Sequence, residues 1–153
     1  MGGQLAAAFA FASAATSAYW LFGGTALLDT VGGSIERLAR DRSIAALAGG
    51  AVTVMAKVIG GVLALWVVRS RSRRLATFAA AVGWLLALYG AVLTVVGGLA
   101  LLGVFGSAGE RPANERALRW HVMLWDPWFL VWGVALAVAG MSVRRRLSSG
   151  GNR

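Results

Sequence analysis

Four long runs of apolar residues dominate the sequence, at residues 5–28, 44–68, 75–105 and 127–143. All charged residues except Lys57 lie in the short stretches between and beyond these runs. A helix needs about 20 mostly apolar residues to cross the hydrocarbon core of a bilayer. The pattern therefore predicts an all-α fold, an integral membrane four-helix bundle that forms a single transmembrane domain over residues 1–153.

The third and fourth runs differ in length from one straight span. The third has roughly 31 residues and would extend about 46 Å as a helix, against a hydrocarbon core of about 30 Å. We expect this helix to bend or end near Gly97 and Gly98, which gives a span of 75–98 or 75–105. The fourth run would extend only about 25 Å. It is expected to gain length from a short interfacial helix that precedes it, from Glu115 to about Trp125.

Capping residues define the ends of the shorter helices. Asn114 can cap the interfacial helix, and Asp126 followed by a proline is typical of a helix start, where the carboxylate binds free backbone N–H groups. In the first long connection, Ser34 is expected to cap a short amphipathic turn on the membrane surface. Glu36 and Arg40 in that turn have the i, i+4 spacing of an ion pair.

Small residues recur at helical spacing, and such stripes let helices pack closely inside a bilayer. The third run repeats them every seven positions, at Ala76, Gly83, Gly90 and Gly97, and the fourth carries Gly133 and Gly140. The second run has a small face that is expected to look into the bundle and a bulky face that is expected to contact lipid. The small face comprises Gly50, Thr53, Lys57, Gly60, Gly61 and Ala64, and the bulky face Val52, Met55, Ile59, Val62 and Trp66. A comparable stripe on the first run comprises Ser13, Thr16, Ser17, Trp20 and Gly24.

Composition narrows the function classes. Hydrophobic residues make up 58% of the chain and charged residues 14%, which excludes a disordered tail and disfavours a soluble enzyme. With no Cys and a single His, the chain has no thiolate nucleophile, no disulfide and no His pair for zinc. It also lacks the P-loop, the G-x-S-x-G motif, the H-E-x-x-H motif and paired carboxylates within a span. We therefore expect no metal and no cofactor.

The charges of the connections predict the orientation. The connection 68–75 and the C-terminal tail together carry a charge of +8 without any acid, whereas the two other connections each hold acids and sum to zero. Lys57 supplies the remaining charge of the net +9. The positive-inside rule then places both termini in the cytoplasm of a bacterial inner membrane. We assign the net charge to topology and to anionic lipid headgroups rather than to nucleic acid, because the short basic clusters have no soluble domain to form a groove.

Small residues at 12–14 and 16–18 resemble signal-peptide cleavage sites. No Lys or Arg precedes the first apolar run, which argues against cleavage. Cleavage would leave three spans and an outward-facing N-terminus.

Lys57 is the first candidate for chemistry. It lies near the centre of the second run, where a Lys costs about 2.5 to 3.5 kcal/mol on insertion scales, and its face of the helix is lined by glycines. Intramembrane ionisable residues are functional candidates, although a Lys that snorkels or packs as the neutral amine is an equal alternative. Its side chain should lean toward the end that carries the acids. Asp29 and Asp126 are candidate partners across water, and Tyr89 is a neutral alternative.

Aromatic residues form the second candidate constellation. Trp120, Trp125 and two further tryptophans lie close together around His121 and Asp126. An interfacial aromatic belt explains most of them, and a helix cap explains Asp126. A lone His in this setting is more often a packing residue, although its titration range keeps proton transfer open. We expect an outward-facing polar vestibule built from Asp29, Lys57, His121 and Asp126 and rimmed by Trp20, Trp120 and Trp125.

Several of these motifs together carry a resemblance to a known family. They are Tyr19-Trp20 to Gly23-Gly24 with Asp29, Arg119-Trp120-His121, and Leu124-Trp125-Asp126-Pro127-Trp128-Phe129. With them the chain resembles the bacterial, mainly actinobacterial, membrane family called domain of unknown function 3995. The resemblance implies a small four-helix integral membrane protein and carries no activity or catalytic residue.

Three functions are compatible with the sequence. The first is a non-enzymatic structural or accessory membrane subunit, favoured by the glycine seams and the lack of catalytic motifs. The second is a small transporter or ligand-binding membrane protein that uses Lys57. The third is a lipid-directed enzyme with His121 and Asp126 as acid and base. The expected partners are membrane lipids, and other membrane proteins or a second copy of the chain are alternatives.

Overall fold

The computed structural model describes residues 1–104 and 114–149, and every regular element within these ranges is helical. The long helices are α1 (Gly2–Leu21), α4 (Ile44–Val67), α5 (Arg73–Leu101) and α7 (Asp126–Ser149). The short elements are α2 (Leu28–Val31), α3 (Gly33–Asp41), α6 (Glu115–Trp120) and the π-helical turn η1 (His121–Trp125). The expected interfacial helix is thus present, as α6 and η1, and Asn114 caps it by accepting a hydrogen bond from the backbone N–H of Ala117 at 3.0 Å.

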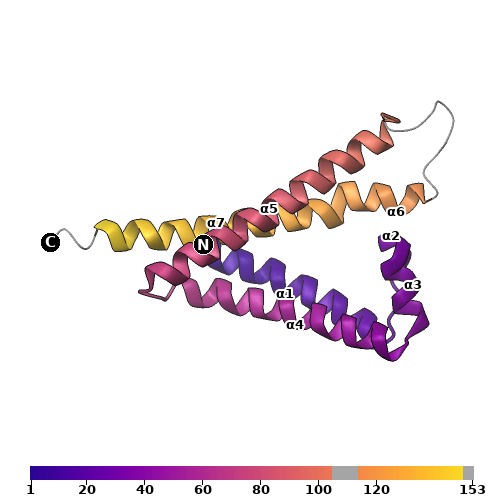
Figure 1. Cartoon of the computed structure of the whole chain (residues 1–153), viewed down its shortest axis with the longest axis horizontal. Coiled ribbons are helices and arrows are strands. Elements are labelled where there is room, and N and C mark those ends of the chain that lie inside the picture. Colours follow the sequence, from indigo (N-terminus) through magenta and orange to yellow (C-terminus); the bar gives the residue numbers. More distant parts are fainter. Residues whose placement is uncertain (105–113, 150–153) are drawn as a thin grey trace.

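The long helices form two pairs, α5 with α7 and α1 with α4 (Figure 1). The pairs lie together near the end that holds the α4–α5 connection and diverge toward the other end. At the open end, α2 and α3 connect the pairs, because α3 follows on to α4 and α2 contacts α6 and η1.

Three helices within the described ranges are long and apolar enough to cross a membrane: α4, α5 and the continuous rod Glu115–Ser149 made by α6, η1 and α7. These correspond to the second, third and fourth predicted spans. The first predicted span, 5–28, becomes a helix that ends at Leu21, and α1 is not among the three. Gln4 and the hydroxyl residues Ser13, Thr16 and Ser17 make α1 less apolar than the other long helices.

The predicted seam of small residues is confirmed as the contact between α5 and α7. A Cβ added to Gly83 would lie 2.7 Å from the carbonyl oxygen of Gly133, and one added to Gly140 would lie 2.6 Å from that of Ala76. A Cβ added to Gly90 would likewise lie 2.7 Å from the carbonyl oxygen of Asp126. The two helices therefore touch backbone to backbone at these glycines, where no side chain fits.

The two faces of α4 are also as predicted, except that Thr53 of the small face is exposed. Gly61 and Ala64 on the small face are buried against α1, and the bulky face is at least half exposed at Val52, Met55, Ile59, Val62 and Trp66. The stripe expected on α1 is half-buried: Ser13 and Ser17 contact Lys57 of α4, and Trp20 packs against Trp125. The residues that α1 buries fully are smaller: Gly3, Ala6, Ala7, Ala10 and Ala14.

The helix α5 continues past Gly97 and Gly98 to Leu101, between the two predicted ends at 98 and 105, and Gly97 packs against Val122 in η1. The predicted cap of the short helix α3 is wrong. Ser34 does not cap α3, whose N-cap is Gly32 with a left-handed φ of 63°. The Ser34 hydroxyl instead accepts a hydrogen bond from Arg37 at 3.1 Å. The expected i, i+4 pair of Glu36 with Arg40 is present, at 2.8 Å.

Asp126 and Pro127 are the first residues of α7 as predicted, but the predicted role of Asp126 as a helix cap is wrong. Asp126 has helical backbone angles and follows η1 without interruption. Pro127 cannot donate a backbone hydrogen bond, and in an α-helix its ring would clash with the carbonyl of Met123, four residues earlier. The wider π turn at 121–125 accommodates this proline. The Asp126 carboxylate is thereby free to bind a side chain instead of a helix end.

Candidate functional site

Lys57 lies on the face of α4 that meets α1. Its ammonium donates a hydrogen bond to the Ser17 hydroxyl at 2.7 Å and a longer one to the Ser13 carbonyl at 3.4 Å. Ser17 lies toward the C-terminus of α1, the end near the α2–α3 connection, so the Lys57 side chain leans toward the N-terminus of its own helix. Neither Asp29 nor Asp126 contacts it directly, because each carboxylate has another partner.

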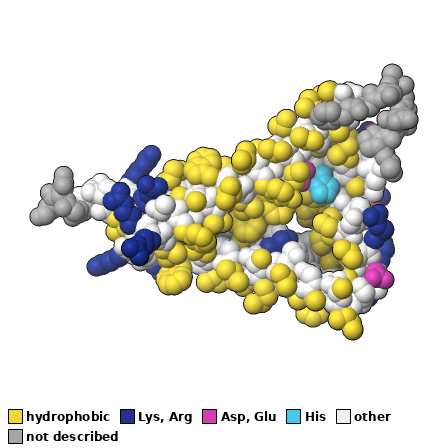
Figure 2. Space-filling view, viewed as in Figure 1, with side chains coloured by type: hydrophobic (Ala, Val, Ile, Leu, Met, Phe, Trp, Pro, Cys, Tyr) yellow, Lys and Arg dark blue, Asp and Glu magenta, His cyan; other side chains and the backbone are white. Residues whose placement is uncertain are grey.

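The gap between the two helix pairs forms a lateral hollow, by which we mean the space between α5–α7 and α1–α4. Figure 2 shows this face of the molecule hollowed toward the open end, with basic side-chain atoms inside the hollow. Aromatic rings connect the two pairs. Tyr89 of α5 packs edge-on against Phe129 of α7, with ring centroids 5.7 Å apart, and Phe129 stacks on Trp132 at 6.2 Å. The Trp132 indole in turn lies against Gly60, one helical turn from Lys57.

Trp132 has an unusual environment for a tryptophan. The residue is only 6% exposed, and its indole Nε1 is buried without a hydrogen-bond partner in the part of the chain that the structure describes. A buried tryptophan N–H usually finds an acceptor, and leaving one unpaired costs about 1 to 3 kcal/mol. Trp132 belongs to the buried core that α1, α4, α5 and α7 share, so this indole N–H is enclosed within the bundle.

His121 and Asp126 form a second polar cluster at the open end. The Val31 carbonyl oxygen lies 3.0 Å from Nε2 of His121, and because a carbonyl only accepts, Nε2 must carry a hydrogen and donate it. Nδ1 lies 2.9 Å from the Asp126 carboxyl oxygen Oδ1. Because Nε2 carries one hydrogen, the bond between Nδ1 and Oδ1 needs another hydrogen, carried by either Nδ1 or Oδ1. Asp126 is 4% exposed and the His121 side chain is 33% exposed, so this is a partly buried bond that links η1, α7 and the end of α2.

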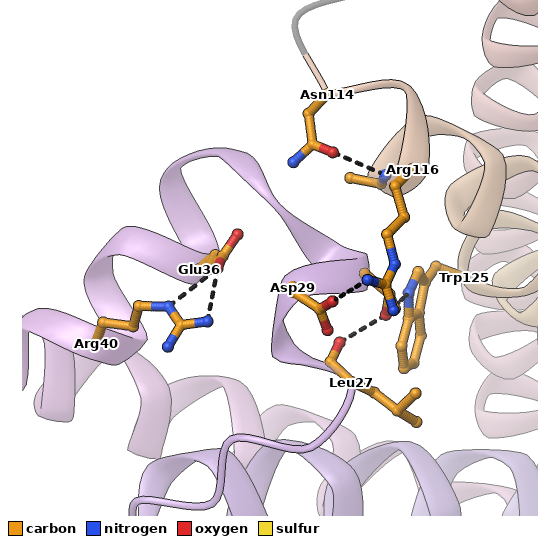
Figure 3. Close-up of polar contacts among 9 residues, drawn as sticks. Leu27, Asp29, Glu36, Arg40, Asn114, Arg116 and Trp125 are labelled. Carbon is orange, nitrogen blue, oxygen red and sulfur yellow. Dashed lines mark hydrogen bonds and ion pairs between the residues drawn. The ribbon is translucent and has the colours of Figure 1, made fainter.

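The short helix α2 is held in place by further contacts besides the hydrogen bond from His121 to Val31. The Trp125 indole N–H donates to the Thr30 hydroxyl at 3.1 Å, and that hydroxyl donates to the Leu27 carbonyl at 2.6 Å. Asp29 pairs with Arg116 of α6 at 3.0 Å, as Figure 3 shows. We call this set of contacts from α2 to α6, η1 and α7 the clasp. Thr30 is fully buried at its centre.

The structure distributes the predicted vestibule residues over two places. Asp29, His121, Trp125 and Asp126 come together in the clasp, and Trp20 joins them edge-on to Trp125 at 5.6 Å. Lys57 lies apart from this group, between α4 and α1. Tyr89 borders the hollow from α5 and is half exposed, and Trp120 is 37% exposed on the rod.

Sequence reasoning missed several residues of these clusters. Thr30 and Arg116 carried no signal, since single hydroxyl and basic residues are common in connections. Ser17 stood in the predicted stripe on the first run without an assigned partner. Trp132 was grouped with the aromatic belt, and only its packing against Gly60 distinguishes it.

Comparisons with known proteins agree with the motif resemblance. The model of the family described as "Protein of unknown function (DUF3995)" matches residues 10–136, which include both clusters. No curated protein and no solved structure matches the chain.

Proposed function

The chain belongs to the DUF3995 family, and we propose that it is a membrane protein that binds an amphiphile with an acidic head group in the lateral hollow, beside Lys57. The observation that carries this proposal is the Lys57 ammonium, which has only a hydroxyl and a carbonyl as partners among the described residues, together with the aromatic rings of α5 and α7 that continue to Gly60, one turn from it. A carboxylate or phosphate would accept from Lys57, and an acyl chain would pack on the rings.

The proposal includes a four-span topology in a bacterial inner membrane. The helix α1 packs along α4 from Gly3, beside Ala64, to Leu21, beside Gly50, so α1 lies at the same depth as a helix with the properties of a span. We place both termini in the cytoplasm. Figure 2 supports this orientation, because basic side chains gather at the end that holds the α4–α5 connection and the end of α7.

The energetics of Lys57 favour a ligand over simple packing. A Lys at the centre of a span costs about 2.5 to 3.5 kcal/mol on insertion scales. Its partners among the described residues are a hydroxyl and a carbonyl, which accept hydrogen bonds but supply no counter-charge. An acidic ligand would supply that charge in a medium of low dielectric constant, where ion pairs are strong.

The other two functions receive less support. A structural or accessory subunit accounts for the clasp, whose acidic groups are paired within the protein, but it assigns no role to Lys57 or Trp132. A lipid-directed enzyme would need His121 as a free acid or base. Both ring nitrogens of His121 are instead engaged, with Asp126 and with Val31.

Binding of a fluorescent fatty acid and of its uncharged alcohol analogue to the purified protein in detergent tests the proposal. We expect the wild type to prefer the acid, Lys57→Met to lose that preference by about tenfold or more, and Lys57→Arg to keep most of it. Arg42→Met removes the same charge at the open end and serves as the control. Unchanged preference in Lys57→Met that is still folded would refute the proposal. A stoichiometric protein that co-purifies equally with wild type and Lys57→Met would favour the accessory function instead.

A further inference from the structure

A second cavity lies at the opposite end of the bundle, between the N-terminus of α5 and the C-terminal part of α7. Its volume is about 510 Å³. It is lined by Arg73, Met141, Arg144, Arg145, Ser148 and Ser149. Three arginines from two helices thus line one cavity, together with one apolar residue, Met141, and two serines.

The charge of this cavity is not balanced within the described residues. Ion pairs within the described residues involve Arg40, Arg116 and Arg119, which all lie in the connections at the open end. Every Asp and Glu that the structure describes also lies in those connections or in the clasp. Arg144 is partly buried while it lines the cavity. Three positive charges in a shared concavity therefore attract an anion from outside the protein.

The cavity has a rigid base. Gly140, one turn before Arg144 on α7, contacts the backbone of Ala76 and Ala80 on α5. Arg73 precedes Ala76 by one turn on α5, so the backbone contact fixes the distance between the helices that carry the arginines. A site on two rigid helices loses less conformational freedom on binding than one on loops.

We infer that this cavity binds the phosphate of an anionic phospholipid, and that a head group with two negative charges is preferred. Guanidinium groups match phosphate oxygens in bidentate geometry. Basic pockets between transmembrane helices are a general feature of such lipid recognition. Three arginines exceed the single charge of one phosphodiester and match a phosphomonoester or a diphosphatidyl lipid better. Met141 and the adjoining apolar helices favour a lipid over a free phosphate, because they provide a surface for the start of an acyl chain.

Native mass spectrometry of the purified protein after exchange into defined lipids tests the inference. The lipids are phosphatidylethanolamine, phosphatidylglycerol and cardiolipin, which carry no, one and two net negative charges. We expect retention to rise in that order and the double variant Arg144→Gln, Arg145→Gln to reduce cardiolipin retention by about tenfold or more. The matched control is Arg69→Gln, Arg71→Gln, which removes the same charge at the same end but lies outside the cavity.

Two results would overturn the inference. Equal loss in the cavity variant and the control would mean that the lipid is attracted by net charge alone. Competition by millimolar inorganic phosphate to the same extent as by cardiolipin would assign the cavity to free phosphate. Circular dichroism confirms that each variant is folded before lipid is added, so a binding loss is separated from unfolding. Success or failure here is independent of the Lys57 proposal, since the two sites lie at different levels of the bundle.

Discussion

The contact between α5 and α7 gives a sharp prediction, because two glycines of one helix differ in their surroundings. Gly83 faces α7 at the seam, whereas a Cβ added to Gly98 would meet nothing within 4 Å. Alanine at Gly98 should therefore stabilise the helix by up to about 1 kcal/mol, which is the difference in helix propensity between glycine and alanine. Alanine at Gly83 gains the same propensity but introduces a clash.

The size of the clash follows from the distances. The new methyl of Gly83→Ala would lie 2.7 Å from the Gly133 carbonyl oxygen, while ordinary contact begins at 3.4 Å. The backbone nitrogen of Ala137 lies closer still, so relief requires the helices to separate locally by about 0.7 Å or more, which forfeits a quarter or more of the dispersion energy of the atom pairs involved. Overpacking of this kind costs about 1 to 3 kcal/mol. Because both variants share the propensity gain, the difference between their free energies of unfolding should equal this cost.

Unfolding of both variants in mixed micelles of rising dodecyl sulfate fraction, followed by circular dichroism, measures the difference. Gly133→Ala serves as a second test, because its methyl would lie 2.6 Å from the Gly83 carbonyl oxygen. The double variant Gly83→Ala, Gly133→Ala should lose less than the sum of the single losses, since one separation relieves both clashes. Equal unfolding midpoints for Gly83→Ala and Gly98→Ala would show that the helices do not touch along this seam.

Two further predictions concern the open end and the topology. Asp126→Ala should loosen the clasp and raise the rate of tryptic cleavage after Arg37 and Arg40 about tenfold, because it removes the hydrogen bond of a buried carboxylate, worth about 1 to 3 kcal/mol. Asp29→Asn removes an exposed ion pair and should change the rate less than threefold. Equal rates for both variants would contradict the role of His121 and Asp126. The chain has no Cys, so the single substitutions Ser34→Cys and Ser70→Cys can report the topology in intact cells. A membrane-impermeant maleimide should label Ser34→Cys but not Ser70→Cys. The reverse labelling pattern would mean that the orientation is inverted.

The sequence predicted the contacts that depend on local spacing. The heptad of small residues from Ala76 to Gly97 identified the face of α5 that meets α7, because close helix packing in a membrane excludes larger side chains. The bulky face of α4 followed from the same periodicity. These features depend only on the periodicity of a single helix, which the spacing of residues in the sequence already gives.

The polar partners could not be predicted in the same way. Val31 and His121 are 90 positions apart in the chain, and Ser17 and Lys57 are 40 positions apart. No local rule connects such residues. Asp126 was assigned to a helix cap because a carboxylate before a proline is typical of one, yet the continuous π turn leaves no helix end for it to bind. The error came from a correct local preference that the tertiary structure overrides.

The divergence of the two helix pairs explains why the polar groups lie where they do. Where the two pairs lie together, the shared core is apolar and consists mainly of alanines from α1, α5 and α7 with Ala64 and Val67 of α4. Toward the open end the pairs separate, and the space can hold rings and hydrogen-bonding groups, among them the Trp20–Trp125 contact and the buried Thr30. A helical bundle in lipid must satisfy such groups internally, because the hydrocarbon offers no partners. The clasp satisfies those of α2, and the Trp132 indole N–H is the one buried side-chain group that the described part of the protein leaves without a partner.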